Sequence, residues 1–161
     1  MSCDVAAAGM IWLASLGGGS PPSLAAVFSP SFTLAGTAPV SHLMAEPLYA
    51  GIVQQAQGLK AVVESYRKAG GAAPLPKFED FKARIDALSA LDMKGHLDLA
   101  ARGTDGDLKC ILKGISQDLP RKLADLSAAT TPKDRAAALD EMFYLLRDNV
   151  EVITTPASVT S

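Results

Sequence analysis

The chain has 161 residues, with 15 basic and 17 acidic side chains and a formal net charge of -2 at pH 7. This length suffices for one domain that buries a core without metals or disulfides, and the slight acidic surplus argues against a general nucleic-acid-binding protein. Aromatic residues make up only 6% of the sequence. Few β-branched runs alternate with period two, so the composition favours helices over strands.

Residues 1–44 form an apolar, charge-poor N-terminal extension, and no Lys or Arg precedes Lys60. The apolar run from Val5 to Leu16 has the length of a signal-peptide core and is too short for a comfortable membrane span. It lacks the basic residues that usually precede such a core. Gly, Ser and Pro then dominate, as in a linker.

Three interpretations of the extension stay open. It is a signal peptide with cleavage near Ala35 and Gly36 or earlier, a cytosolic tail without a packed structure, or a short helix against the rest of the chain. The first is slightly favoured, and it predicts a periplasmic or secreted protein rather than a cytoplasmic one.

The first helix is predicted from about Ala45 to Ala69, with Pro47 in its first turn and Gly70 after its end. A second helix is predicted from near Lys77 to about Arg102. Apolar residues recur three or four positions apart in both helices, as one buried face requires. In the first they are Tyr49, Ile52, Ala56, Leu59, Val63 and Tyr66, and in the second Phe78, Phe81, Ile85 and Leu88. The apolar register becomes unclear after Leu91.

The third and fourth helices have the strongest periodicity. The third, with Thr104 as its expected N-cap, contains Pro120, which predicts a kink in one helix because the apolar phase continues beyond it. The fourth begins at Pro132 after the N-cap Thr131, with Asp134 in its first turn. The apolar positions are Leu108, Ile111, Leu112, Ile115, Leu119, Leu123 and Leu126 in the third helix, and Leu139, Met142, Phe143, Leu146 and Val150 in the fourth.

Short links between helices make antiparallel neighbours. The sequence therefore predicts an all-α protein, an up-and-down antiparallel four-helix bundle with an irregular N-terminal extension. The bundle domain is expected to span residues 45–161, with its helices over about 45–154. A homodimer is a further expectation, because Tyr144, Leu145 and Val152 lie beside the core face of the fourth helix.

His96 is the strongest candidate for chemistry. It lies four residues after Asp92 and three after Met93, so the three side chains can share part of a helix surface. Helical bundles bind haem or metals through such residues. However, the chain has no Glu-x-x-His motif and no haem-attachment motif. The favoured interpretation is a half-exposed His96 paired with Asp92.

Two weaker signals have plainer explanations. Asp105 and Asp107 resemble the start of a calcium loop, but helix capping explains them better because the later ligands are missing. Cys110 lies between Lys109 and Lys113, which favours a reactive thiol, yet no histidine partner can be placed beside it. A structural or incidental cysteine is preferred, with an interchain disulfide next. Aromatic side chains lining a cavity in the bundle are likewise less favoured than plain core.

The sequence contains no set of nucleophile, base and orienting group, so an enzyme is not expected. The predicted function is a non-catalytic helical bundle that binds a protein partner or a small ligand, exported if the extension is a signal peptide. The alternative is a haem- or metal-binding bundle for electron transfer or storage, with Asp92, Met93 and His96 as candidate ligands. The preferred expectation is that no cofactor is bound, with no nucleic-acid partner and no stable membrane span.

Overall fold

The computed structural model describes residues 41–70, 75 and 77–155. The helices in these ranges are a short 3-10 helix and four α-helices, and these ranges contain no strand. In chain order the elements are η1 (His42–Ala45), α1 (Pro47–Lys68), α2 (Phe78–Arg102), α3 (Gly106–Ala128) and α4 (Pro132–Thr154). The predicted helices are confirmed, with ends that differ by at most two residues from the expected ones where these were given.

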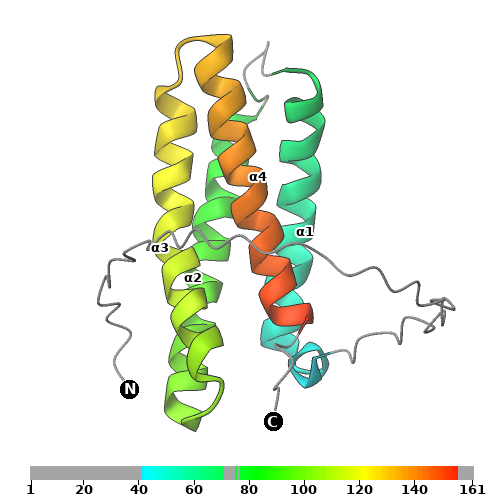
Figure 1. Ribbon diagram of the computed structural model, residues 1–161, viewed down its shortest axis with the longest axis vertical. Coiled ribbons are helices and arrows are strands. Elements are labelled where there is room, and N and C mark those ends of the chain that lie inside the picture. The colour runs from blue at the N-terminus through cyan, green and yellow to red at the C-terminus, as the bar shows by residue number, and fades with distance from the viewer. Residues whose placement is uncertain (1–40, 71–74, 76, 156–161) are drawn as a thin grey trace, which may run out of the picture. The chain divides into compact units, whose positions relative to one another are not determined.

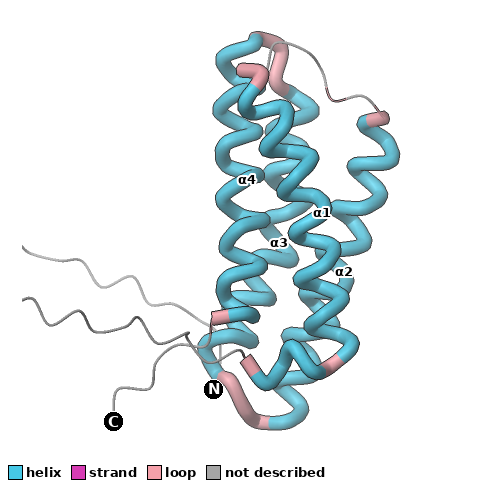
Figure 2. Tube along the Cα trace, turned by 90° about the vertical axis from the view of Figure 1, so that its right-hand side faces the viewer, coloured by secondary structure: helices cyan, strands magenta, loops and turns pink. Residues whose placement is uncertain are grey.

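The helices run alternately up and down, as Figure 1 shows. α1 packs against α2 and α4, and α3 also packs against α2 and α4, so each helix has two neighbours. Figure 2 shows the α2–α3 link at one end of the bundle, beside η1, and the α3–α4 link at the other. Within the described ranges, the predicted all-α up-and-down four-helix bundle is therefore confirmed.

The ends of most helices follow the local sequence. Thr131 caps α4 as predicted, because its Oγ1 accepts a 3.1 Å hydrogen bond from the backbone N–H of Asp134. Gly70 and Gly103 follow α1 and α2 with φ values of +68° and +69°. This left-handed conformation favours glycine and ends a helix.

The start of α3 differs from the prediction. Asp105, not Thr104, is its N-cap, with a φ of +46° and no hydrogen bond from its side chain to the helix. Thr104 Oγ1 instead donates a 3.1 Å hydrogen bond to Asp105 Oδ2. Only Gly103, Thr104 and Asp105 connect α2 to α3. The chain reverses over these three residues, and the residue directly before α3 is Asp105 in the left-handed conformation. Asp tolerates this conformation better than most residues.

Pro120 lies inside α3, which is continuous from Gly106 to Ala128. The expectation of one helix across Pro120 is confirmed, and the kink stays a prediction. The α3 core face includes Leu112, Ile115 and Leu119, all buried. Ile111 was expected on the same face, but 42% of it is exposed. It lies one position before Leu112, outside the surface that α3 turns to its neighbours.

Candidate functional site

The most buried polar feature is a pair of side chains in the bundle core. Asp92 of α2 and Asn149 of α4 both have an exposed fraction of 0%. Asn149 Nδ2 donates a 2.9 Å hydrogen bond to Asp92 Oδ2. The helical spacing explains the position of Asp92, because it follows Ile85 and Leu88 on the same buried face of α2. A polar pair thus replaces apolar packing at this level.

The hydrogen bonding of this pair is incomplete. Asp92 Oδ1 and Asn149 Oδ1 are the only buried side-chain polar atoms in the described ranges that have no partner. Burial raises the pKa of Asp92 to about 7, against the opposing effect of the hydrogen bond from Asn149. The carboxyl group thus keeps its proton to a higher pH than an exposed aspartic acid does. No sequence pattern identified Asn149, because a single Asn in an amphipathic helix usually faces solvent.

The structure separates the three predicted ligands of a haem or metal. Asp92 faces Asn149 in the core, whereas His96 Nδ1 lies 2.7 Å from the backbone oxygen of Lys109 on α3. Met93 is half-buried. The expected pairing of His96 with Asp92 is thus replaced by two other contacts. Across the described part of the chain, no group of three His, Cys, Asp or Glu residues is placed to hold a metal ion.

A larger hollow lies at the η1 end of the bundle. It is a cleft of about 460 Å³ between η1, the first turns of α3 and the last turn of α4. Its lining residues are Ser41, His42, Leu43, Asp105, Gly106, Asp107, Leu108, Ile111, Val152 and Thr155. We call this hollow the η1 cleft.

The wall of the η1 cleft is mainly apolar. It is formed by Leu43, Leu108, Ile111 and Val152, each from or beside the end of a helix. Leu43 is buried, whereas 42% of Ile111 remains exposed. Asp105 also lines the cleft, so the acids that resembled a calcium loop belong to this region. Sequence periodicity missed the cleft because it placed Ile111 in the core.

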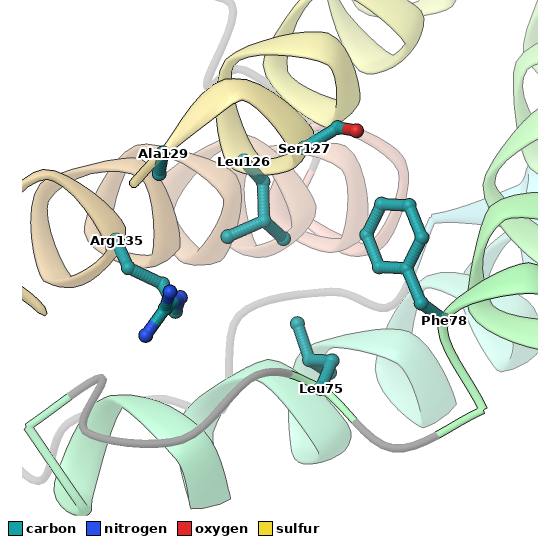
Figure 3. Close-up of a pocket in the computed structure, with 6 residues that line it drawn as sticks. All are labelled: Leu75, Phe78, Leu126, Ser127, Ala129 and Arg135. Atoms are coloured by element: carbon teal, nitrogen blue, oxygen red, sulfur yellow. The ribbon is translucent and has the colours of Figure 1, made fainter. Parts of the chain in front are cut away.

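A second hollow lies at the opposite end of the bundle. In Figure 3, Leu75, Phe78 and Leu126 surround it, and the Arg135 side chain extends toward it from α4. Ser127 and Ala129 complete the lining. Its volume is about 170 Å³, below the roughly 300–1,000 Å³ of typical small-molecule sites. Two further hollows, of about 350 and 440 Å³, reach that size but are lined mainly by charged residues and alanine. The η1 cleft, with its larger apolar side chains, is therefore the better candidate for a binding site.

Aromatic and basic side chains meet on the α1–α4 face. The Arg67 guanidinium lies 4.4 Å from the ring centre of Phe143, and that of Arg147 lies 4.9 Å from Tyr144. Arg67 also pairs with Asp140. Tyr144 is 45% exposed. These charges are largely balanced by partners within the same face.

The residues proposed for a homodimer surface do not form one exposed patch. Tyr144 is exposed, whereas Leu145 and Val152 are half-buried, and Val152 lines the η1 cleft. The homodimer stays a prediction.

Cys110 is disulfide-bonded, and the described residues include no free cysteine. Cys110 is thus not the reactive thiol that Lys109 and Lys113 would favour. The other cysteine of the sequence, Cys3, lies outside the described residues. So do the predicted signal peptide and linker over residues 1–40 and the tail over residues 156–161.

No helix in the described ranges is both long and apolar enough to cross a membrane. Comparisons with protein-family models, with curated proteins and with solved structures found no match to this chain.

Proposed function

We propose that the protein is a non-catalytic binding protein that takes a small, largely apolar ligand in the η1 cleft. The observation that supports this most is the size and wall of the cleft. Its volume of about 460 Å³ falls within the roughly 300–1,000 Å³ of small-molecule sites, which are mostly apolar with a few polar groups. The sequence analysis did not choose between a protein partner and a small ligand. The volume of the cleft favours the small ligand.

The polar groups of the cleft restrict the ligand further. The charged residues of the lining are Asp105 and Asp107, the other polar ones are Ser41, His42 and Thr155, and no Lys or Arg lines the cleft. A negatively charged ligand would meet like charges there, which weakens binding. A neutral or positively charged apolar molecule is therefore the expected class.

The test is a fluorescence titration with two naphthalene probes, neutral N-phenyl-1-naphthylamine and anionic 8-anilinonaphthalene-1-sulfonate. The neutral probe should bind with the higher affinity. The Ile111→Gln variant should weaken its binding about tenfold, since losing contact with one buried aliphatic side chain costs roughly 1.5–3 kcal/mol and tenfold is about 1.4 kcal/mol.

Leu97→Gln is the matched control. Leu97 is 60% exposed and lies outside the lining of the cleft, so the same type of substitution there should leave the affinity unchanged. Equal binding by the wild-type protein and Ile111→Gln would refute the proposed site. If neither the neutral nor the anionic probe binds, the proposed function is refuted.

We also propose that the protein is exported. The charge-poor extension supports this, because its apolar run has the length of a signal-peptide core. The test is the intact mass of the protein from its source cells. Export predicts loss of an N-terminal segment ending between residues 16 and 36, which would also remove Cys3. A full-length mass would contradict cleavage.

The haem- or metal-binding alternative has no comparable support. Asp92 contacts Asn149 and His96 contacts the Lys109 backbone, so these two candidate ligands are held by different partners. Its test is the absorbance and metal content of the native protein, compared with His96→Ala. A colourless, metal-free native protein would end this alternative.

A further inference from the structure

The Asp92–Asn149 hydrogen bond joins two helices whose backbones are not direct neighbours. α2 and α4 each pack against α1 and α3, but no Cα atom of α2 lies within 8 Å of a Cα atom of α4. They are therefore diagonal partners in the bundle. The bond between Asn149 Nδ2 and Asp92 Oδ2 spans the centre of the core at 2.9 Å.

The chemistry of the two oxygen atoms without partners depends on one proton. An ionised Asp and the Oδ1 atom of Asn can only accept hydrogen bonds. With Asp92 ionised, neither Asp92 Oδ1 nor Asn149 Oδ1 can satisfy the other. A proton on Asp92 Oδ1 makes it a donor, and Asn149 Oδ1 is an unused acceptor on the same partner side chain. A carboxylic acid and an amide can then form two hydrogen bonds instead of one.

We propose that Asp92 and Asn149 act as a proton-dependent clasp between α2 and α4. Protonated Asp92 closes the clasp with two hydrogen bonds. Release of that proton to solvent leaves a buried carboxylate with one donor, which weakens the core between the two helices. The inference does not depend on the proposed ligand site, which lies at the η1 end of the bundle.

The surrounding ionisable groups are engaged elsewhere. Burial dominates the pKa of Asp92, which it raises to about 7, and the hydrogen bond from Asn149 is the one opposing cause. Three charged or titratable groups on the elements around the core have partners of their own, and Lys94, two positions after Asp92, is exposed. These pairs are Tyr49 of α1 with Asp98 of α2, His96 of α2 with the Lys109 backbone of α3, and Arg147 with Asp148 on α4.

The direction of the pH effect follows from the shift. The pKa of Asp92 rises from 3.8 to about 7 in the folded protein, so between these values the folded state holds a proton that the unfolded state has lost. The folding equilibrium therefore weakens as pH rises from about 4 to about 7, by up to about a thousandfold for a shift of roughly three pKa units. Above that range this contribution is constant.

The first test is a ¹³C NMR titration of the Asp92 carboxyl carbon in the wild-type protein. The proposal predicts a carboxyl group that is still protonated well above pH 3.8, the ordinary pKa of an aspartic acid side chain. Ionisation of Asp92 near that ordinary value would overturn the proposal. This measurement does not require any variant to fold.

The second test compares the pH dependence of urea unfolding in the wild-type protein, Asp92→Asn and Asp86→Asn. An Asn at position 92 keeps the shape and cannot lose a proton, so the fall in stability between about pH 4 and pH 7 should disappear. The Asp86→Asn control should retain it. Identical pH profiles for the wild-type protein and Asp92→Asn would overturn the proposal.

Discussion

Asn149 Nδ2 lies 2.9 Å from Asp92 Oδ2, and neither side chain has any exposed surface. A polar pair inside an apolar core gives up hydrophobic stabilisation, but it favours the one arrangement of helices in which both partners meet. In this bundle the pair fixes the axial register of α2 relative to α4. It contributes to the specificity of the packing as well as to its response to pH.

Replacing both members of the pair by leucine should not destabilise the protein near pH 8. Buried polar pairs replaced by well-packed apolar residues of similar volume are often neutral or stabilising by about 1–4 kcal/mol. Asn149→Leu alone should cost about 1–3 kcal/mol, because Asp92 would lose its only hydrogen bond. Urea unfolding of the two single variants and the double variant measures the coupling. A double variant as unstable as the sum of the singles would contradict this role.

Gly95 should tolerate alanine poorly. A Cβ atom there would lie 3.1 Å from Leu112 Cδ1, 3.3 Å from Ile52 Cδ1 and 3.4 Å from Tyr49 Cε1. Crowding in a packed core typically costs about 1–3 kcal/mol, which exceeds the gain in helix propensity of about 1 kcal/mol.

Gly114→Ala is the matched control for Gly95→Ala. Gly114 is also inside a helix, but a Cβ atom added there would meet nothing within 4 Å. Alanine at this position should stabilise α3 by about 0.5–1 kcal/mol. Thermal unfolding of both variants tests the contrast, and equal shifts would show that the core at Gly95 can expand freely.

Tyr49 should ionise last among the tyrosines as pH rises. Its side chain is buried and its hydroxyl donates a 2.8 Å hydrogen bond to Asp98 Oδ2, and both effects raise its pKa well above 10. The neutral form is favoured in the folded state, so stability falls as pH rises above the unfolded pKa of about 10. Ultraviolet titration should show that one of the three tyrosines resists ionisation until the protein unfolds. Tyr49→Phe should remove that delayed step.

The fold was predictable because the helical periodicity is strong in most of the chain. The exception was α2 after Leu91, and the structure explains why. Its buried face continues through Asp92, Gly95 and Leu99, and two of these residues are not apolar. A pattern based on hydrophobicity therefore fades where the helix is still fully packed.

The site was less predictable, for tertiary reasons. Its spacing from His96 made Asp92 a candidate ligand in the sequence. Its hydrogen-bond partner is instead Asn149, which lies 57 positions away on the diagonal helix α4. Ile111 has the correct helical phase for the core, yet it lies near the start of α3, at the end of the bundle, where the η1 cleft forms. Neither placement can be obtained without the packing of all four helices.

The most direct test of the proposed binding function is an NMR titration of the wild-type protein with N-phenyl-1-naphthylamine. We expect the largest shifts in methyl signals from the apolar wall of the η1 cleft, namely Leu43, Leu108, Ile111 and Val152. Methyl signals of Leu75 and Leu126, in the smaller hollow at the opposite end, should stay unchanged. Shifts confined to that opposite end, or no shifts at all, would contradict the account.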